Sequence, residues 1–474
     1  MVIMTQTNIS KPGTQKMRRD VVGGKRGNGH FFQKIGRKVR RPNPGRVRNG
    51  ISDQTLTSAA GLVPFGTFIR NQGVDAELSA FFGGMKTGRS VVYTMPSQIR
   101  LLIDAGAAGE SRVFGLEHLS SDPLFVHLSG GTVPSIDTVY RDLDRFDGPH
   151  LLALEHLMAR HGMWKRRLRN SAAPIHLDID TTVEPLFGSQ EGARVGYNPR
   201  YHGRPSYHPI IARVAETRTC VGALLRPGDS SFGDDDASFV RHVTRRVHDV
   251  LGHGQALRVR IDKSGDCAAI MNALQDEHAV FVTKARLTPD LASAVFAHKN
   301  WRTVLLDEEN KPLRQVAELS FARDEWNKNA LSVRVIALRT REPVSGGEAF
   351  LWPGLEYSAK VFLTNDFDSA ADAIAREYED RAGIEPMIDE LKRELGIGAV
   401  PTDSFDANQA MLLIKLLAYN LVRRFVDAQF PHLSAWRLSW LRRALFCVPG
   451  RFLRSGHRYY LRLPPGCALN PLLN

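Results

Sequence analysis

The chain is expected to be an α/β protein with helical flanks, and three observations predict this. Apolar residues recur at helical spacing from about residue 56 to residue 164. Near Pro174 the pattern changes to strands, which then alternate with helical runs, as in layered α/β domains. After Ser369 the spacing becomes helical again.

The first strand of the α/β centre is expected at residues 175–180. Ile175, Leu177 and Ile179 alternate with His176, Asp178 and Asp180, so one face is apolar and the other bears carboxylates. Further strands are expected at 209–214, at 256–261 and, as short runs in a β-rich stretch, at 280–282, 301–305, 316–321, 331–338 and 349–352; helices are expected at 237–251, 370–379, 387–395 and 407–425.

Within the helical N-terminal flank, the segment 134–141 has the signature of a helix start. Ser135 is a good N-cap residue and follows Pro134. A helix beginning there would carry Thr138 and Arg141 on its polar face, where they could lie against DNA. A helical packing domain explains the same pattern.

The positive charge of the chain is concentrated at its two ends. Of the formal net charge of +13, residues 1–50 contribute +12 and residues 431–474, which contain no acid, contribute +7. The body is therefore mildly acidic. Basic ends on such a body suit a polyanion such as DNA, because each cation placed against a phosphate releases a condensed counterion. A solvated tail and a basic surface helix are the alternative, and a membrane surface is disfavoured because neither end has a long amphipathic pattern.

The cysteines and the apolar stretches indicate in which cellular compartment the protein is expected. The four cysteines lie far apart without a C-x-x-C pair, which gives neither a zinc ribbon nor a disulfide framework. The N-terminus has no apolar signal-peptide core. The longest apolar stretch, 410–422, contains Lys415 and is too short to span a bilayer, so it predicts a buried helix. A cytoplasmic protein is expected.

Three carboxylates stand where elements end or begin. Asp180 ends one expected strand, Asp262 ends another, and Glu385 lies in a helical region. Taken alone, an acid at a strand end is usually a turn or cap residue. On a continuous helix, however, Tyr378, Arg381, Glu385 and Lys392 would fall within a stripe of about 60°. One helix face would then present a carboxylate between two cations and a phenol, which suits a metal ion and phosphates.

The residue pattern Y-x2-R-x3-E-x6-K in this helical region resembles the signature of DDE transposases of the broad insertion-sequence-4-like group. The rest of the chain resembles one branch, the insertion sequence 1380 family. The resemblance extends from about residue 56 to the C-terminus and rests on the segments 176–182, 188–193, 196–199, 260–262, 363–365 and 417–421.

The resemblance implies a ribonuclease-H-like core interrupted by a β-rich insertion. Composition predicts a basic disordered tail at residues 1–50, which are rich in Gly, Pro, Asn and basic residues without hydrophobic periodicity. Together with the resemblance it gives the order of the remaining parts: a helical N-terminal DNA-binding domain (51–168), the first part of the core (169–282), the insertion (283–362), the second part with the catalytic helix (363–430) and a basic C-terminal segment (431–474).

By position, the resemblance makes Asp180, Asp262 and Glu385 the three catalytic, metal-binding acids. They are expected to hold two Mg²⁺ ions, for which Mn²⁺ can substitute, since hard oxygen ligands suit these cations. Asp178 shares a strand face with Asp180 and is its rival, but the family places Thr or Ser directly after the catalytic acid, which favours Asp180. Tyr378, Arg381 and Lys392 match residues that hold the transposon-end DNA.

Two departures from the family pattern matter. Pro386 directly follows Glu385, so either the helix kinks there or a new helix begins with Pro386 in its first turn. After Asp262 the chain reads Lys-Ser-Gly-Asp, where the family more often has Ser-Gly and an aromatic residue. Lys263 could contact phosphate or be merely exposed, and Asp266 could be confused with the catalytic acid.

The expected function is that of a cut-and-paste transposase that acts on terminal inverted repeats, binds duplex DNA at transposon ends and target, and works as a homodimer on DNA in the bacterial nucleoid. Trp301 and Trp326 could stack an unpaired base, although a core or surface role is the alternative for each. The Arg- and Trp-rich C-terminal end could contact DNA or a second subunit. An inactive DNA-binding descendant and a structure-selective nuclease are the competing functions.

Overall fold

The computed structural model describes residues 53–164, 173–198, 201–252, 255–342 and 357–472. The basic tail expected at 1–50 and the strand expected at 349–352 lie outside these ranges. The N-terminal flank is helical, as expected, and its helices are α1 (Leu62–Asn71), α2 (Val74–Phe82), α3 (Met95–Ala108), α4 (Leu116–Leu119), α5 (Pro123–Leu128), α6 (Ile136–Leu143) and α7 (Gly148–Gly162). Ser135 caps α6 by accepting a hydrogen bond from the Thr138 N–H, as the sequence predicts.

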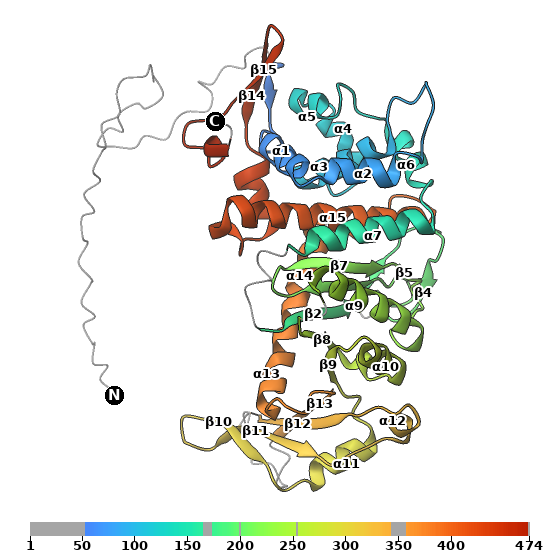
Figure 1. Ribbon diagram of the computed structural model, residues 1–474, viewed down its shortest axis with the longest axis vertical. Coiled ribbons are helices and arrows are strands. Elements are labelled where there is room, and N and C mark those ends of the chain that lie inside the picture. The colour runs from blue at the N-terminus through green and yellow to red at the C-terminus, as the bar shows by residue number, and fades with distance from the viewer. Residues whose placement is uncertain (1–52, 165–172, 199–200, 253–254, 343–356, 473–474) are drawn as a thin grey trace, which may run out of the picture. The chain divides into compact units, whose positions relative to one another are not determined.

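In the described residues, the centre of the protein is one mixed sheet of nine strands in the order β10-β11-β12-β13-β9-β8-β2-β6-β7 (Figure 1). Strand β2 runs parallel to β8, and β8 parallel to β9, whereas the other neighbours are antiparallel. The strands are β2 (Ile175–Thr181), β6 (Ile210–Val214), β7 (Thr219–Leu224), β8 (Leu257–Ile261), β9 (Val280–Lys284), β10 (Arg302–Leu306), β11 (Pro312–Leu319), β12 (Arg334–Arg341) and β13 (Tyr357–Thr364).

The β-rich stretch extends this sheet and does not form a sheet of its own. Strand β13 pairs with β9 at one side and with β12 at the other, so β10 to β13 continue the order begun by the central strands. The stretch expected as an insertion at 283–362 is therefore hydrogen-bonded into the central sheet through β13 and β9.

Helices cover the two faces of the sheet. The apolar side of β2 packs in one core with α9 (Ala237–Leu251) and α10 (Ala268–Asp276). The opposite face meets α13 (Ala371–Asp380), whose Ile374 packs with Val282 and Phe362. The remaining helices of this half are α11 (Pro289–Ala297) and α12 (Asp324–Lys328).

A long buried helix, α15 (Phe405–Gln429), joins the helical flank to the sheet. It contacts α7, α3 and β7, and every residue from Ala410 to Val422 is buried, as the sequence predicts. Among the described helices, none combines the length and hydropathy of a membrane span.

Two small three-stranded sheets complete the fold. One has the order β3-β5-β4 and follows β2; its strands are β3 (Glu184–Pro185), β4 (Arg194–Val195) and β5 (Pro205–Tyr207). The other has the order β1-β14-β15, with β1 (Leu56–Thr57), β14 (Gly450–Ser455) and β15 (Arg458–Arg462). The strands β14 and β15 of this second sheet lie where the sequence predicted only a basic segment, and β1 lies at the start of the flank that was expected to be helical.

Candidate active site

The register of two parallel strands brings the first two predicted acids together. In the pairing of β2 with β8, Ile179 lies opposite Ile261, so Asp180, the next-to-last residue of β2, and Asp262, directly after β8, come together at the same end of the sheet. Each acid also fixes its own backbone. The Thr181 N–H donates to Asp180 Oδ1 at 2.9 Å, and the Ser264 N–H donates to Asp262 Oδ1 at 2.9 Å.

Asp178, the rival for the first acid, is fully buried in an ion-pair network. The Arg213 Nε donates to its Oδ2 at 3.0 Å, and the Arg260 Nε donates to its Oδ1 at 2.6 Å. Because its side chain has no exposed surface, Asp178 offers no oxygen to a ligand from solvent. This geometry favours Asp180 over Asp178.

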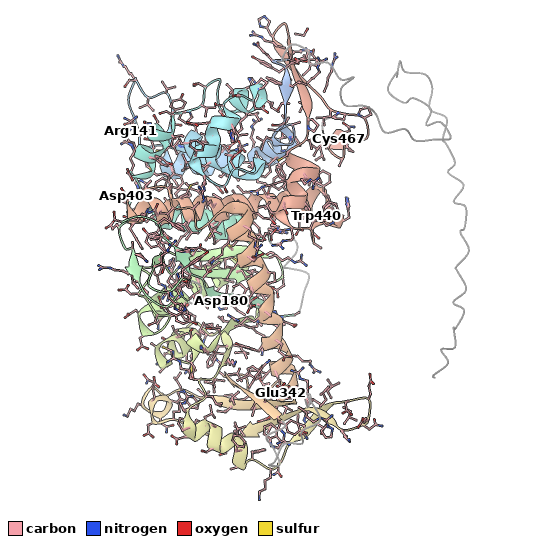
Figure 2. The ribbon with its side chains drawn as sticks, turned by 180° about the vertical axis from the view of Figure 1, so that it is seen from behind. Arg141, Asp180, Glu342, Asp403, Trp440 and Cys467 are labelled. Atoms are coloured by element: carbon pink, nitrogen blue, oxygen red, sulfur yellow. The ribbon has the colours of Figure 1, made fainter. Side chains whose placement is uncertain are left out.

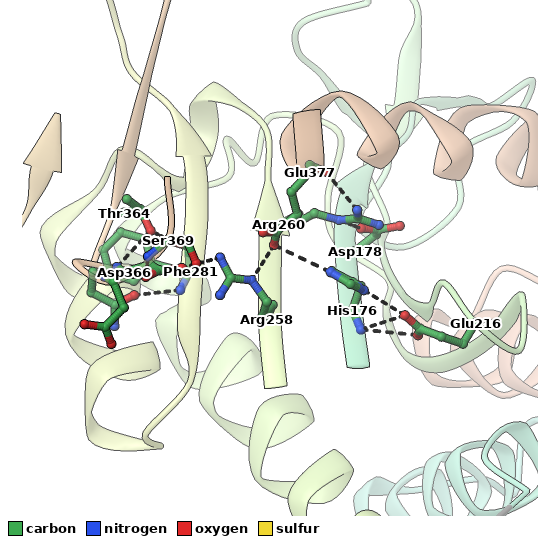
Figure 3. A network of polar contacts seen from close by, with 12 residues as sticks. His176, Asp178, Glu216, Arg258, Arg260, Phe281, Thr364, Asp366, Ser369 and Glu377 are labelled. Carbon is green, nitrogen blue, oxygen red and sulfur yellow. Dashed lines mark hydrogen bonds and ion pairs between the residues drawn. The ribbon is translucent and has the colours of Figure 1, made fainter. Parts of the chain in front are cut away.

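The same network fastens the third segment to the sheet (Figure 3). Arg260 Nη1 donates to the Glu377 carbonyl of α13 at 2.9 Å, and Arg258 Nε donates to the Glu377 carboxylate at 2.7 Å. Arg213 donates to the Gly383 carbonyl at the end of the turn that follows α13. Arg213, Arg258 and Arg260 therefore hold the segment 377–383 in place against the central sheet.

The helical segment that carries Glu385 is not one continuous α-helix. α13 ends at Asp380, a 3-10 turn covers Arg381–Gly383, α14 runs Ile384–Glu390, and a π-helical turn covers Leu391–Leu395. A new α-helix therefore begins with Pro386 in its first turn, which is one of the two outcomes the sequence predicts. In that turn the missing proline N–H breaks no bond of α14.

Arg381 and the three acids form one electrostatic cluster around Asp180, which Figure 2 labels. Arg381 Nη2 lies 3.0 Å from Asp180 Oδ1, and both side chains are largely buried. Burial, the largest cause, raises the pKa of Asp180 to about 6; Arg381 lowers this pKa, whereas Asp262 and Glu385 raise it further. Two acids from distant parts of the chain, Asp262 and Glu385, therefore lie near enough to Asp180 to affect its ionisation.

Tyr378 belongs to the same cluster. Its ring packs against Phe362 with the ring centres 4.8 Å apart. Burial raises the pKa of its hydroxyl to about 12, against the effect of Arg381, and Asp262, Asp180 and Glu385 raise it further. The phenol is thus held protonated, as a hydrogen-bond donor, beside the acids.

Lys392 lies apart from the Arg381–Asp180 contact. Its Nζ donates to the Val183 carbonyl at 2.7 Å and lies 3.3 Å from Glu184 Oε1. Lys392 therefore contacts the segment directly after β2, and 3-10 and π turns interrupt the continuous helix on which the stripe was expected.

The other residues considered from the sequence, two tryptophans and two residues after β8, differ in how deeply they are buried. Trp326 is 2% exposed and packs on Phe321, so the expectation that it stacks a base is corrected: it is a core residue. Trp301 is partly buried, with the Arg339 guanidinium 4.2 Å from its ring centre. Asp266 is buried and pairs with Arg323 at 2.7 Å, which separates it from the site, and Lys263 is exposed.

Sequence reasoning missed the residues that position this site, namely Arg213, Arg260, Glu377 and Gly383. The signal available was the pattern Arg258-Val259-Arg260 inside a buried strand, because two cations on one face of such a strand require acidic partners. In the described part of the chain, no group of three or more His, Cys, Asp or Glu side chains is positioned to hold a metal ion.

Comparison with known proteins adds the family. No curated protein matches the chain. Among solved structures, the cryo-EM structure of a piggyBac transposase synaptic complex with hairpin DNA is similar at 11% identity and a TM-score of 0.40, over 81% of this chain and 79% of that one. The family profile described as transposase DDE domain, group 1, matches residues 43–474. Since the match covers nearly the whole length, the chain belongs to the transposase DDE domain group 1 family.

Proposed function

We propose that this protein is a cut-and-paste DNA transposase of the insertion sequence 1380 type, with Asp180, Asp262 and Glu385 as its catalytic acids. Membership of the DDE transposase family supports the reaction class. The observation that carries the choice of residues is the position of Asp180, in contact with Arg381 and close enough to Asp262 and Glu385 for both acids to raise its pKa. On this proposal the sheet and the helices on its two faces form a ribonuclease-H-like core that β10 to β13 extend.

The donor set fits divalent cations in its residue types, whereas in the described residues no three such side chains are arranged together as metal ligands. Carboxylate oxygens are the ligands that Mg²⁺ prefers, and a bound cation would offset the effect of Asp262 and Glu385, which raise the pKa of Asp180. Asp180, Asp262 and Glu385 would hold two Mg²⁺ ions, with Mn²⁺ as a substitute. When bound, such a pair activates the attacking hydroxyl and stabilises the leaving oxygen of an in-line displacement.

The remaining residues of the cluster bind and orient the DNA on this proposal. Arg381 presents guanidinium N–H groups beside Asp180, where a scissile phosphate would lie, and a guanidinium matches phosphate geometry well. The protonated Tyr378 hydroxyl donates to a neighbouring phosphate oxygen. Lys392 steadies the segment after β2 through Val183 and Glu184, and reaches DNA only where that contact opens.

The substrate on this proposal is duplex DNA at the transposon ends, held by two copies of the chain. Trp301 would stack an unpaired base on the ring face opposite Arg339, since the Arg339 guanidinium lies over one face and Nε1 donates to the His298 carbonyl. The N-terminal helices, among them α6 with its exposed Arg141, contact the end sequence. The host compartment is the bacterial nucleoid.

A cleavage assay tests the proposal. A supercoiled plasmid carrying the short inverted repeats that flank the gene should be cut in the presence of Mg²⁺. Asp262→Ala should abolish cutting and retain DNA binding, whereas Asp290→Ala, which removes an exposed acid of α11, should cut like the wild type.

Each outcome discriminates between functions. Cutting that survives Asp262→Ala overturns the assignment of that residue. Binding without cutting by the wild type indicates an inactive DNA-binding descendant, and cutting that ignores the inverted repeats indicates a structure-selective nuclease.

A further inference from the structure

The C-terminal hairpin of β14 and β15 has two faces of different character. Its strands are joined by a turn at Gly456, whose φ of +60° suits glycine, and its other neighbour is β1 (Figure 1). Residues directly opposite each other on neighbouring strands share a face, and successive residues alternate. The register therefore shows on which of the two faces each side chain of the hairpin lies.

One face is turned toward the protein. It carries Phe452 opposite Leu461 and Arg454 opposite Tyr459. Leu461 packs against the main helical core. The His127 ring of α5 lies 4.2 Å from the Tyr459 ring and 5.0 Å from the Phe452 ring, between centres. This face therefore anchors the hairpin.

The other face, called the basic face below, is turned away from that core. The pairs Arg451–Arg462, Leu453–Tyr460 and Ser455–Arg458 lie on it, and Leu56 of β1 continues it beside Arg451. The three arginines are exposed, and Tyr460 is 47% exposed. A two-stranded ribbon thus displays three cations and an aromatic ring to solvent.

Two arginines of the basic face, Arg458 and Arg462, carry the argument from charge. Arg462 lies directly opposite Arg451, and Arg458 lies opposite Ser455. Residues 431–474 contain no acid, and no ion pair links Arg458 or Arg462 to a carboxylate in the described ranges. By contrast, Arg437 of the same segment pairs with Asp389 at 2.9 Å. Arg458 and Arg462, which have no such partner in the described ranges, are therefore available to a bound polyanion.

We propose that the basic face binds duplex DNA, with Arg451, Arg458 and Arg462 against the phosphates. The inference rests on the proposed function and adds a second DNA contact to it, distinct from the Asp180 cluster. A two-stranded β-ribbon fits the major groove, and arginine contacts to phosphate position a protein on DNA without reading sequence. The polar tip Ser455-Gly456-His457 lacks the apolar anchor that insertion into a lipid surface requires.

The test compares two double variants that remove equal charge. Arg458→Gln with Arg462→Gln changes the basic face. Arg241→Gln with Arg245→Gln is the matched control, because those exposed arginines of α9 pair with Asp276 and Glu277. Binding to a short duplex is measured by fluorescence anisotropy over a series of salt concentrations without divalent metal, and thermal unfolding checks that each variant folds.

The basic-face variant should bind duplex DNA roughly tenfold more weakly at low salt. It should also flatten the slope of log affinity against log salt by about 1.8, since each lost phosphate contact removes about 0.9. The control should match the wild type in both. The single change Arg458→Gln, next to the turn, should give half of the change in slope.

Two other results overturn the inference. Wild-type slope and affinity in the basic-face variant, with metal-dependent cutting intact, would refute the ribbon contact and leave the proposed function standing. Binding of the wild type to phosphatidylserine vesicles that the variant loses, without a change in DNA affinity, would assign the face to a lipid surface. A wild-type chain that binds no duplex refutes both proposals.

Discussion

At the scale of single residues, Asp178 and Asp180, which are two residues apart in β2, differ in how their charges are compensated. Asp178 has no exposed surface and is compensated by two guanidinium groups. Asp180 has one such partner, Arg381, and lies next to two further acids. Removing a compensated buried charge leaves its partners uncompensated, whereas removing a crowded one relieves repulsion.

Asp178→Asn is therefore expected to lower the free energy of unfolding by about 3 to 5 kcal/mol, because Arg213 and Arg260 lose their charge partner in the interior. Asp180→Asn should leave it unchanged or raise it, since burial lifts the pKa of Asp180 to about 6 and so penalises its ionised form at neutral pH. Urea unfolding of both variants checks this. Equal destabilisation by the two changes would contradict it.

Lys415 gives a pH-dependent prediction. It is buried in α15 and donates to the Ala399 carbonyl at 3.3 Å. Burial lowers its pKa to about 7, although Glu184 opposes this. Between about pH 7 and its unfolded pKa near 10.5, the unfolded chain binds a proton that the folded chain has released, so this group makes stability rise with pH.

Lys415→Met should remove this contribution. The wild type should gain stability relative to the variant by up to about 1.4 kcal/mol per pH unit between pH 7 and pH 9. Chemical unfolding of both proteins at several pH values measures the difference, in which the other titrating groups cancel. A difference that stays constant with pH would show that Lys415 keeps its proton in the folded protein.

Much of the candidate site could be predicted from residue types and spacing, and some could not. Asp180 and Asp262 were proposed from the family resemblance and from their places at the ends of expected strands, and the parallel register of β2 and β8 brings them together. The roles of Arg213 and Arg260 could not be read, because a partner 35 or 82 residues away in sequence is fixed by strand order alone. Trp326 was misplaced because an aromatic side chain alone does not distinguish a core from a stacking surface.

At the scale of elements, the helical segment around Glu385 is built from short pieces. A 3-10 turn before α14 and a π turn after it change the angular step per residue, so side-chain directions depart from those of one ideal helix. This explains why Arg381 meets Asp180 while Lys392 meets Glu184. Such irregular turns depend on tertiary contacts like that of Arg213 with Gly383, which spacing alone does not reveal.

Pro386→Ala tests this segmentation. Because Pro386 lies in the first turn of α14, its replacement should change the free energy of unfolding by less than about 1 kcal/mol and leave DNA cutting intact. In the interior of a continuous helix a proline costs about 3 kcal/mol, so the same change would then stabilise the protein by that amount. Differential scanning calorimetry of the two proteins separates these outcomes.

The strands of the β-rich stretch show what periodicity can give at this scale. β10 and β9 lie close to the runs expected from their alternation. That these strands join the central sheet could not be predicted, since alternation defines the faces of a strand and not its neighbours.

The hairpin of β14 and β15 was missed because its arginines dominated the interpretation of the C-terminal segment, although Ser455-Gly456 is a turn signal between alternating runs.

At the scale of the whole molecule, α15 closes one edge of the central sheet. β7 is the last strand on that side. The Asn420 amide accepts from the Cys220 N–H at 2.9 Å and donates to the Cys220 carbonyl at 2.7 Å, as a neighbouring strand would. Gln409 does the same for the Leu225 N–H and the Ala223 carbonyl. The side-chain amides of Asn420 and Gln409 thus bond backbone groups at the outer edge of β7, as a neighbouring strand would.

Asn420→Leu is expected to lower the free energy of unfolding by about 2 to 4 kcal/mol, because it keeps the side-chain size and leaves the buried Cys220 N–H and carbonyl without partners. Gln429→Leu, at the exposed end of the same helix, is the control and should have little effect. Denaturant unfolding followed by circular dichroism measures both. A neutral Asn420→Leu would mean that water reaches the β7 edge.

The late position of α15 in the chain has a consequence for synthesis. When a ribosome has made all strands of the sheet through β13, Gln409 and Asn420 are still unmade, because α15 begins at Phe405. The nascent protein therefore passes through an interval in which the outer edge of β7 lacks the partners that these two residues supply to Cys220 and Leu225, and an unpaired strand edge nucleates aggregation. Messages truncated upstream of codon 405 should yield chains that collect in inclusion bodies or on chaperones.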